Sequence, residues 1–251
     1  MHATIVTCYY RLNKSKHTNE EYTQWIRHFI LHLKDAHLVV FTCEKDEPFI
    51  RDLFLENLSL RVLFKRKEIE EFRVSKEYPT IWKAQEAMDP TPSCGRGIEC
   101  YKIWNTKFEF LKEAIEMNPF QSEYFVWNDI GNVRQENLID YVSTYPCSSK
   151  FSQHKLDIVI LNGYKEPKFF FQNEVHFSGS LFGSHKDTLL ALYELFYLYF
   201  DLYVEKGYFI GCDQQIFSTL WMKHPDRINP VIPFTTQVDP WFYLYEYYSA
   251  K

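Results

Sequence analysis

The feature that most constrains the fold is an alternation of short apolar runs and amphipathic stretches over the first 65 residues. Residues 4–10, 38–43 and 58–64 are apolar runs typical of buried strands, and residues 22–33 and 47–55 between them have a helical pattern. Strands that alternate with helices pair in parallel, because each helix carries the chain back across the sheet. The pattern predicts an α/β fold with a central, mostly parallel mixed sheet flanked by helices.

The rest of the chain continues as strands and helices, without an internal repeat or a long low-complexity segment. Thr18 and Glu21 have the spacing of a capping box, and Asn118-Pro119 ends a helix, because proline disfavours helical geometry in the residue before it. With 251 residues, the chain has the length of one large domain over 1–251. The further elements expected are a helix over 101–117, strands over 123–127 and 156–161, an extended segment over 175–182 that Gly179 interrupts, helices over 189–204 and 213–221, and an aromatic tail over 240–248.

Composition and charge exclude several functional classes. The chain has a net charge of −5, so it lacks the large positive electrostatic field that binding to nucleic acid requires. The most apolar stretch, residues 189–204, carries Glu194 and Asp201 on one side of a helix, which indicates packing on a core and no transmembrane segment. Peripheral membrane contact stays open. Six cysteines without zinc-site spacing, and a start that lacks the pattern of a signal peptide, favour free thiols in the cytoplasm of a bacterium, or of a host cell if the source is viral.

The strongest local signal for a site is an apolar strand that runs into Asp129 and then Gly131. In parallel α/β sheets, ligands bind beyond the carboxyl ends of the strands, which is where Asp129 is expected. A carboxylate there can hold Mg²⁺ or Mn²⁺, the hard cations that accompany nucleotide diphosphates. The alternatives are that Asp129 caps the turn that follows and that Asn128 is a turn residue.

Two later segments are weaker candidates. Gly179 and Gly183 would let the backbone approach a ligand closely, but their segment lacks the glycine spacing of a phosphate-binding loop. Asp213 is either the N-cap of the helix that follows it or a general base. Several cations could pair with phosphates, or else form a solvated face: Arg11, Lys14, Lys16 and Lys107.

Four stretches of the sequence resemble the HtrL/YibB family. The match spans roughly residues 4–221, with the densest agreement between 101 and 134. The stretches are residues 4–11 with 21–25; residues 38–42; residues 103–107 with Ala114, 118–120, 124–131 and Arg134; and the segment around Gly179 and Gly183 with Asp213-Gln214 beyond it.

That family resembles glycosyltransferases of the GT-A type. The resemblance implies one Rossmann-like domain, with a nucleotide-sugar half over about 1–134 and an acceptor half with the C-terminal tail over about 135–251. GT-A enzymes bind their metal and donor through an Asp-x-Asp motif at the end of a central strand. Asp129 matches the first Asp, whereas Gly131 takes the place of the second, so the expected Mn²⁺ or Mg²⁺ site is weakened. His224 resembles a late metal-binding histidine.

The resemblance also implies roles for individual residues. Asp213 is the candidate catalytic base of an inverting reaction, or orients the donor in a retaining one, and Asp213-Gln214 resembles a pair that contacts the donor sugar or the acceptor. The implied metal ligands are Asp129 and His224. The implied donor-binding residues are Thr7, Tyr9, Arg11, Lys107, Asn128, Asp129, Gly131, Gly179 and Gln214.

The expected function is transfer of a hexose or pentose from a nucleotide-diphosphate sugar to a hydroxyl group of a glycan or glycolipid, in surface glycan or lipopolysaccharide synthesis. Such an enzyme must offset the charge on the leaving phosphate and align the acceptor hydroxyl with C1 of the sugar. The missing second Asp favours an alternative, a non-catalytic module that binds a nucleotide sugar or carbohydrate. A nucleotidylyltransferase is disfavoured, because no glycine-rich loop follows the first strand.

Overall fold

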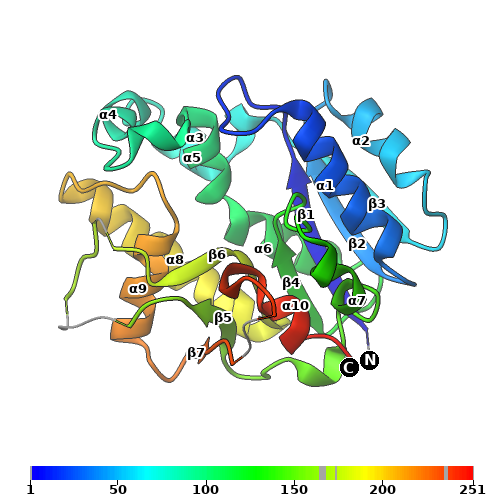
Figure 1. Ribbon diagram of the computed structural model, residues 1–251. Coiled ribbons are helices and arrows are strands. Elements are labelled where there is room, and N and C mark those ends of the chain that lie inside the picture. The colour runs from blue at the N-terminus through cyan, green and yellow to red at the C-terminus, as the bar shows by residue number, and fades with distance from the viewer. Residues whose placement is uncertain (1, 164–167, 173, 235–236, 251) are drawn as a thin grey trace.

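A seven-stranded mixed sheet forms the centre of the protein (Figure 1). The computed structural model describes residues 2–163, 168–172, 174–234 and 237–250. The strand order is β3-β2-β1-β4-β6-β5-β7, and among these strands β6 alone runs antiparallel to its neighbours. The strands are β1 (Ala3–Tyr9), β2 (His37–Thr42), β3 (Arg61–Arg66), β4 (Tyr124–Asn128), β5 (Leu156–Ile160), β6 (Phe177–His185) and β7 (Ile228–Val231). The predicted α/β class with a mostly parallel mixed sheet is confirmed.

Helices cover both faces of this sheet (Figure 1). In the strands, successive side chains point to opposite faces. Phe125 and Trp127 of β4 therefore join one core, while Val126 joins the other. The α-helices are α1 (Asn19–His32), α2 (Glu47–Phe54), α3 (Arg73–Glu77), α4 (Trp82–Ala87), α5 (Ile98–Trp104), α6 (Lys107–Met117), α7 (Ile139–Val142), α8 (Lys186–Glu205), α9 (Gln214–Lys223) and α10 (Leu244–Tyr247).

The first core contains the inward faces of α6, α8 and α9, and it is built largely from aromatic rings. Phe108 of α6 lies 4.9 Å from Phe196 of α8 and 6.0 Å from Phe217 of α9, measured between ring centroids. The second core contains α1 and α2, with Ile26, Phe29 and other apolar side chains against the opposite face of the sheet. Much of the high aromatic content is thus core, and α8, the most apolar helix, is packed within it.

The first elements of the chain agree with the prediction. The capping box of Thr18 and Glu21 begins α1, with the Glu21 amide donating to the Thr18 hydroxyl and the Thr18 amide to the Glu21 carboxylate. Two later elements differ. The helix expected over 101–117 is two helices, α5 and α6, because the chain turns at Asn105 and Thr106. The segment expected to be interrupted at Gly179 is one continuous strand, β6.

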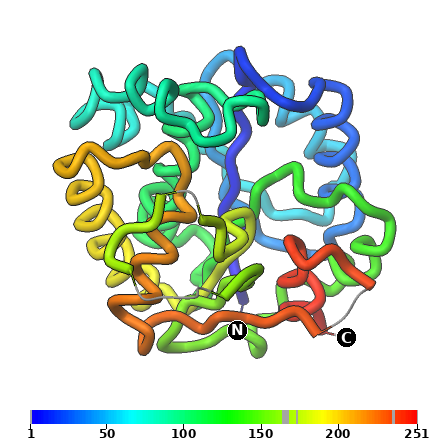
Figure 2. Tube along the Cα trace, turned by 60° about the vertical axis from the view of Figure 1, so that its left-hand side comes forward, coloured from blue at the N-terminus to red at the C-terminus, as the bar shows by residue number. Residues whose placement is uncertain are grey.

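The C-terminal tail returns to the second core. In Figure 2 the red end of the chain lies beside the green segment that includes α7, and the Cys147 amide donates to the Tyr248 carbonyl at 2.8 Å. The rings of Phe151 and Tyr248 are stacked with their centroids 4.0 Å apart. Within the described residues, no helix is both long and apolar enough to cross a membrane.

Candidate active site

A cleft opens at the carboxyl ends of β1 and β4. It consists of two adjoining cavities of about 190 and 310 Å³, which share Tyr22, Trp104, Asp129 and Arg134 as lining residues. This is the edge of a parallel sheet at which α/β proteins bind ligands, because helix N-termini and loops converge there. The sequence predicted a site at this edge, at the end of the strand that precedes Asp129.

Asp129 lies at the centre of this cleft. Its amide donates to the Ser180 carbonyl at 2.8 Å, so the residue is held beside β6 just past the end of β4. Its carboxylate accepts a hydrogen bond of 2.7 Å from the indole of Trp127, and 34% of the side chain is exposed. Within the described chain, the hydrogen bonds of this carboxylate do not cap the turn that follows it. The carboxylate therefore faces the cleft.

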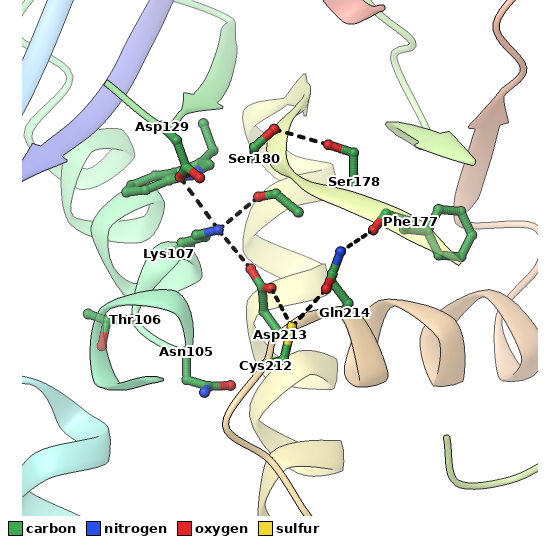
Figure 3. A network of polar contacts seen from close by, with 12 residues as sticks. Asn105, Thr106, Lys107, Asp129, Phe177, Ser178, Ser180, Cys212, Asp213 and Gln214 are labelled. Carbon is green, nitrogen blue, oxygen red and sulfur yellow. Dashed lines mark hydrogen bonds and ion pairs between the residues drawn. The ribbon is translucent and has the colours of Figure 1, made fainter. Parts of the chain in front are cut away.

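The other carboxylate of the cleft, Asp213, is buried and joined to Asp129 through a lysine (Figure 3). Lys107 Nζ lies 2.9 Å from Asp213 Oδ2 and 3.5 Å from Asp129 Oδ1, and it donates to the Gly179 carbonyl at 2.8 Å. The side chains of Lys107 and Asp213 are each only 3% exposed. Two acidic residues that are 84 positions apart in the sequence thus pair with the same ammonium group.

The break between α5 and α6 positions this lysine. The Asn105 side chain donates to the Tyr101 carbonyl at 2.9 Å and to the Ile210 carbonyl at 2.8 Å, which ties the break to the segment before Asp213. Lys107 is then the first residue of α6. A continuous helix would have rotated the lysine differently, so the departure from the predicted helix is a feature of the site.

Asp213 and Gln214 stand at the N-terminus of α9. Asp213 occupies the N-cap position of α9, as one interpretation of the sequence expected, but its side chain makes no capping hydrogen bond. Gln214 donates to the Phe177 carbonyl at 2.6 Å and accepts from the Cys212 thiol at 2.8 Å. Gly179 faces them, and a Cβ atom there would lie only 2.8 Å from Asp213 Oδ1. We call Lys107, Gly179, Asp213 and Gln214 the buried wall of the cleft.

Burial and charge pairing act in opposite directions on the buried wall. Burial alone would lower the pKa of the Lys107 ammonium, but the carboxylates of Asp129 and Asp213 outweigh it and raise that pKa above its usual value. Burial raises the pKa of the Asp213 carboxyl, and the Lys107 ammonium opposes this rise. The thiol of Cys100, which also lines the cleft, has its pKa raised by burial to about 12 and remains neutral. Lys107 is therefore a fixed positive charge.

Loops form another part of the lining, and they carry exposed cations. We call these cations, Arg11, Lys14, Lys16 and Arg134, the loop wall. Arg134 donates to the Gly131 carbonyl at 3.0 Å and lies 4.4 Å from the centre of the Trp25 ring. With Arg96 and Lys107, six cations line the cleft against the two carboxylates Asp129 and Asp213. The cleft is locally positive in a chain whose net charge is −5.

Eight of the predicted site residues line the cleft, and three lie elsewhere. Thr7 is fully buried within β1. Asn128 is the last residue of β4, and its side chain accepts a hydrogen bond of 2.7 Å from the Tyr245 hydroxyl, which is not part of the cleft lining. His224 is the C-cap of α9 and lies 2.9 Å from the Tyr199 hydroxyl. The residues that do line the cleft are Tyr9, Arg11, Lys107, Asp129, Gly131, Gly179, Asp213 and Gln214.

The cleft does not provide a site for a divalent cation from its own side chains. His224 is at the far end of α9 from Asp213, a rise of about 15 Å for ten helical residues. Gly131 stands at the position where a second carboxylate beside Asp129 would be needed. The carboxylate of Asp213 already pairs with the Lys107 ammonium. Across the described ranges, no cluster of three or more His, Cys, Asp or Glu side chains could hold a metal ion. The fold therefore does not assemble the predicted Asp129 and His224 ligand pair.

Sequence reasoning did not assign a role to several residues of the cleft. Arg134 follows Asp129 by five positions in the same loop, and this short spacing was the available signal. Tyr22 and Trp104 come from helices whose exposed faces could not be oriented toward the cleft before the packing was known. Trp241, in the C-terminal tail, lines the second cavity, and its carbonyl accepts a hydrogen bond of 2.9 Å from the Ser178 hydroxyl.

Comparisons with known proteins give a family and two distant likenesses. The family described as "Bacterial protein of unknown function (HtrL_YibB)" matches residues 1–250. No curated protein matches the chain significantly. Mouse xyloside xylosyltransferase 1, in its apo form, is 14% identical over 92% of this chain and 84% of that one, with a TM-score of 0.49. PaToxG glycosyltransferase is 8% identical over 88% of this chain and 69% of that one, with a TM-score of 0.41. Likenesses this distant assign no activity to the chain.

Proposed function

The chain belongs to the HtrL_YibB family, as its sequence motifs predicted, and we propose that it is a glycosyltransferase with a GT-A-type domain. Its donor is a nucleotide-diphosphate sugar, and its acceptor is a hydroxyl group of a glycan or glycolipid. The observation that carries the proposal is the cleft itself. It combines six cations with two carboxylates at the carboxyl ends of β1 and β4.

The first cavity suits a nucleoside. Tyr9, Tyr22 and Trp104 line it, and aromatic rings provide faces on which a base can stack. Gly131 allows the loop after β4 to lie close to Tyr22, because a Cβ atom at Gly131 would be 3.1 Å from that ring. The base and ribose are therefore assigned to the space between the end of β1 and the helices α1 and α5.

The diphosphate is assigned to the loop wall. Phosphate oxygens accept strong hydrogen bonds from guanidinium and ammonium groups, and Arg134 is the best-placed donor because Gly131 and Trp25 already orient it. Within the described residues, Arg134 and Lys16 form no ion pair with a carboxylate, whereas Arg11 lies 3.9 Å from Asp46 and Lys14 3.1 Å from Glu86. The uncompensated charge of Arg134 and Lys16 is thus free to bind phosphate.

The sugar and the acceptor are assigned to the second cavity, against the buried wall. The acceptor oxygen bonds to C1 while the bond from C1 to the phosphate oxygen breaks, and the nucleotide diphosphate leaves with that electron pair. The cations of the loop wall stabilise the charge that develops on the leaving group. In an inverting reaction, Asp213 takes the proton of the acceptor hydroxyl, and in a retaining reaction Asp213 orients the donor sugar. Trp241 provides an aromatic face for a saccharide at the outer side of this cavity.

One observation favours a second candidate, a non-catalytic module that binds a nucleotide sugar. Gly131 occupies the position of the second Asp of an Asp-x-Asp motif, and a site that lacks this carboxylate can bind a nucleotide sugar without turning it over. Hydrolysis of a nucleotide sugar separates the two candidates. A glycosyltransferase is expected to release the sugar slowly to water, and a binding module is not.

The proposal is tested by ligand-induced stabilisation and by donor turnover. UDP, GDP and CDP are screened by thermal unfolding, because a ligand that binds only the folded state raises apparent stability. Asp129→Ala is expected to abolish turnover of the donor that binds, while the fold remains intact. Asp226→Ala removes an exposed carboxylate, paired with Arg227 outside the cleft, and is the matched control. If Asp129→Ala retains full turnover, the site assignment is wrong.

A further inference from the structure

A single ammonium group replaces a second carboxylate as the companion of Asp129. Three oxygen atoms surround Lys107 Nζ within 3.5 Å, two from carboxylates and one from the Gly179 carbonyl. The ammonium donates to the carbonyl and forms ion pairs with both carboxylates, so its charge is engaged within the cleft. Figure 3 shows the ammonium between Asp129, above it, and Asp213, below it. The position between the two acids is therefore taken by a cation of the chain itself.

The surrounding fold is built around this cation. Gly179 leaves room for the Asp213 carboxylate, because a Cβ atom would lie 2.8 and 2.9 Å from its two oxygens. The indole of Trp127 donates to Asp129 and lies with its ring centre 5.7 Å from Lys107 Nζ. A buried charge is costly unless it is paired and hydrogen-bonded, and here both conditions are met. Lys107 is consequently held in place before any ligand arrives.

A divalent cation at Asp129 would conflict with this arrangement. It would have to approach the carboxylate whose Oδ1 atom already lies 3.5 Å from an ammonium, and the like charges would repel each other. The buried Asp213 cannot turn to the ion without leaving Lys107 as an unpaired buried charge. Hard cations also need several oxygen ligands, and of the two carboxylates in this cleft only that of Asp129 is partly exposed.

We propose that Lys107 takes the place of a divalent metal, so that the cleft binds a nucleotide diphosphate without one. Lys107 neutralises Asp129 and Asp213, which would otherwise repel phosphate, and the loop wall supplies the direct phosphate contacts. This inference rests on the proposed donor site, but it differs from the metal dependence that an Asp-x-Asp motif would imply. The expected donor complex is therefore formed equally well in EDTA and in Mn²⁺.

The first experiment uses the wild-type protein. Binding of UDP, GDP and CDP is measured by isothermal titration calorimetry in EDTA and in Mn²⁺, and Mn²⁺ is also titrated alone. The inference requires that at least one nucleotide binds with equal affinity in both buffers and that Mn²⁺ alone does not bind at the cleft. Affinity that appears only with Mn²⁺ overturns the inference and leaves the glycosyltransferase proposal standing. If no nucleotide binds in either buffer, the donor-site proposal fails as well.

The second experiment converts the site. Lys107→Ala leaves Asp129 and Asp213 facing a vacated space, which is an oxygen-lined site of the kind that Mn²⁺ binds. In EDTA, this variant is expected to bind nucleotide roughly 10–100-fold more weakly, because the two carboxylates are no longer neutralised and repel phosphate. Mn²⁺ is expected to restore the affinity and to bind the variant directly, as seen by the electron paramagnetic resonance signal of bound Mn²⁺.

Lys112→Ala is the matched control, because Lys112 lies on the same helix α6 but pairs with Glu116 outside the cleft. It is expected to bind nucleotide as the wild type does in both buffers. Circular dichroism reports whether Lys107→Ala folds, and if it does not, the wild-type titrations decide the matter alone. A folded Lys107→Ala that keeps wild-type affinity in EDTA overturns the role given to Lys107.

Discussion

The two walls of the cleft differ in how their charges are compensated. On the buried wall, Lys107 and Asp213 are almost inaccessible and face each other at 2.9 Å. On the loop wall, Arg134 is exposed and is oriented by a carbonyl oxygen and an aromatic ring. A compensated, buried wall is rigid and sets geometry, whereas an uncompensated, exposed wall attracts anions. Under the proposed function, bond making takes place at the buried wall, and the loop wall binds phosphate.

Substitution of Asp213 is expected to have the largest effect on turnover and is the strongest test of the difference between the two walls. Asp213→Asn keeps the shape of the side chain but removes the proton acceptor, so kcat is expected to fall roughly 10²–10⁴-fold if the reaction inverts. Nucleotide affinity is expected to be unchanged, because the loop wall is intact. Single-turnover kinetics and calorimetry measure the two quantities. A variant that loses nucleotide affinity but keeps kcat would reverse the roles of the two walls.

Arg134 is the corresponding residue on the loop wall. Arg134→Ala removes charge-assisted hydrogen bonds to phosphate, and nucleotide binding is expected to weaken about 10–100-fold. The salt dependence of binding is also expected to decrease, because exposed charges are screened by salt. Calorimetry at two ionic strengths measures both effects. Arg27→Ala, which removes an exposed arginine paired with Glu56, is the control; equal losses in the two variants would contradict the assignment.

Two glycines of β6 sharpen the comparison further. A Cβ atom at Gly179 would meet the Asp213 carboxylate at 2.8 Å, and one at Gly183 would meet the Phe151 ring at 2.7 Å. Both alanine variants are expected to lose about 1–3 kcal/mol of stability through overpacking. Gly179→Ala alone is expected also to lose turnover, because it displaces Asp213. Thermal unfolding and donor turnover, measured well below both midpoints, distinguish them. Equal turnover in the two variants would argue against a positioned Asp213.

The smallest effect expected is a pH dependence at Asp89, which pairs with the cleft residue Arg96. Burial raises the pKa of Asp89, but hydrogen bonds from Tyr101, Thr91 and Arg96 outweigh it and hold the pKa below its usual value. The Asp89 carboxylate therefore adds to the free energy of unfolding at pH values above its pKa in the unfolded chain, about 3.9. This contribution is lost as the pH falls through the lower pKa that Asp89 has in the folded protein. Asp89→Asn is expected to remove a contribution on the order of 1 kcal/mol at pH 7. Unfolding midpoints at pH 7 and in acid measure it, and a difference that persists unchanged in acid would contradict this sign.

The parallel half of the sheet was predictable because its signals are local. Apolar runs separated by amphipathic helices define β1, β2 and β3, and a capping box marks the start of α1. The second half was less predictable. The glycine at 179 suggests an interruption when it is read alone, but hydrogen bonds to β4 and β5 on both sides keep β6 extended through it. Direction and pairing of a strand depend on partners distant in the sequence.

The candidate site shows the same division. The apolar strand that ends before Asp129 singled out this residue, and Asp213-Gln214 was recognised as a motif. The ion pairs that connect both acids through Lys107 depend on the break between α5 and α6 at Asn105 and Thr106, which the sequence did not predict. His224 was expected near Asp129, yet the length of α9 carries it away from the cleft. A helix translates residues by about 1.5 Å each along its axis, so an error about which end faces the site becomes a large displacement.

By itself, the sequence determined the α/β class and the family, and it predicted the edge of the sheet at which the candidate site lies. Those properties follow from periodicity, caps and strand ends, which act between neighbouring residues. Only the tertiary structure decided that one buried ammonium joins two acids 84 residues apart and that the exposed cations line the same cleft. Charges interact through space according to distance and burial, and neither quantity exists until the helices and the sheet have packed.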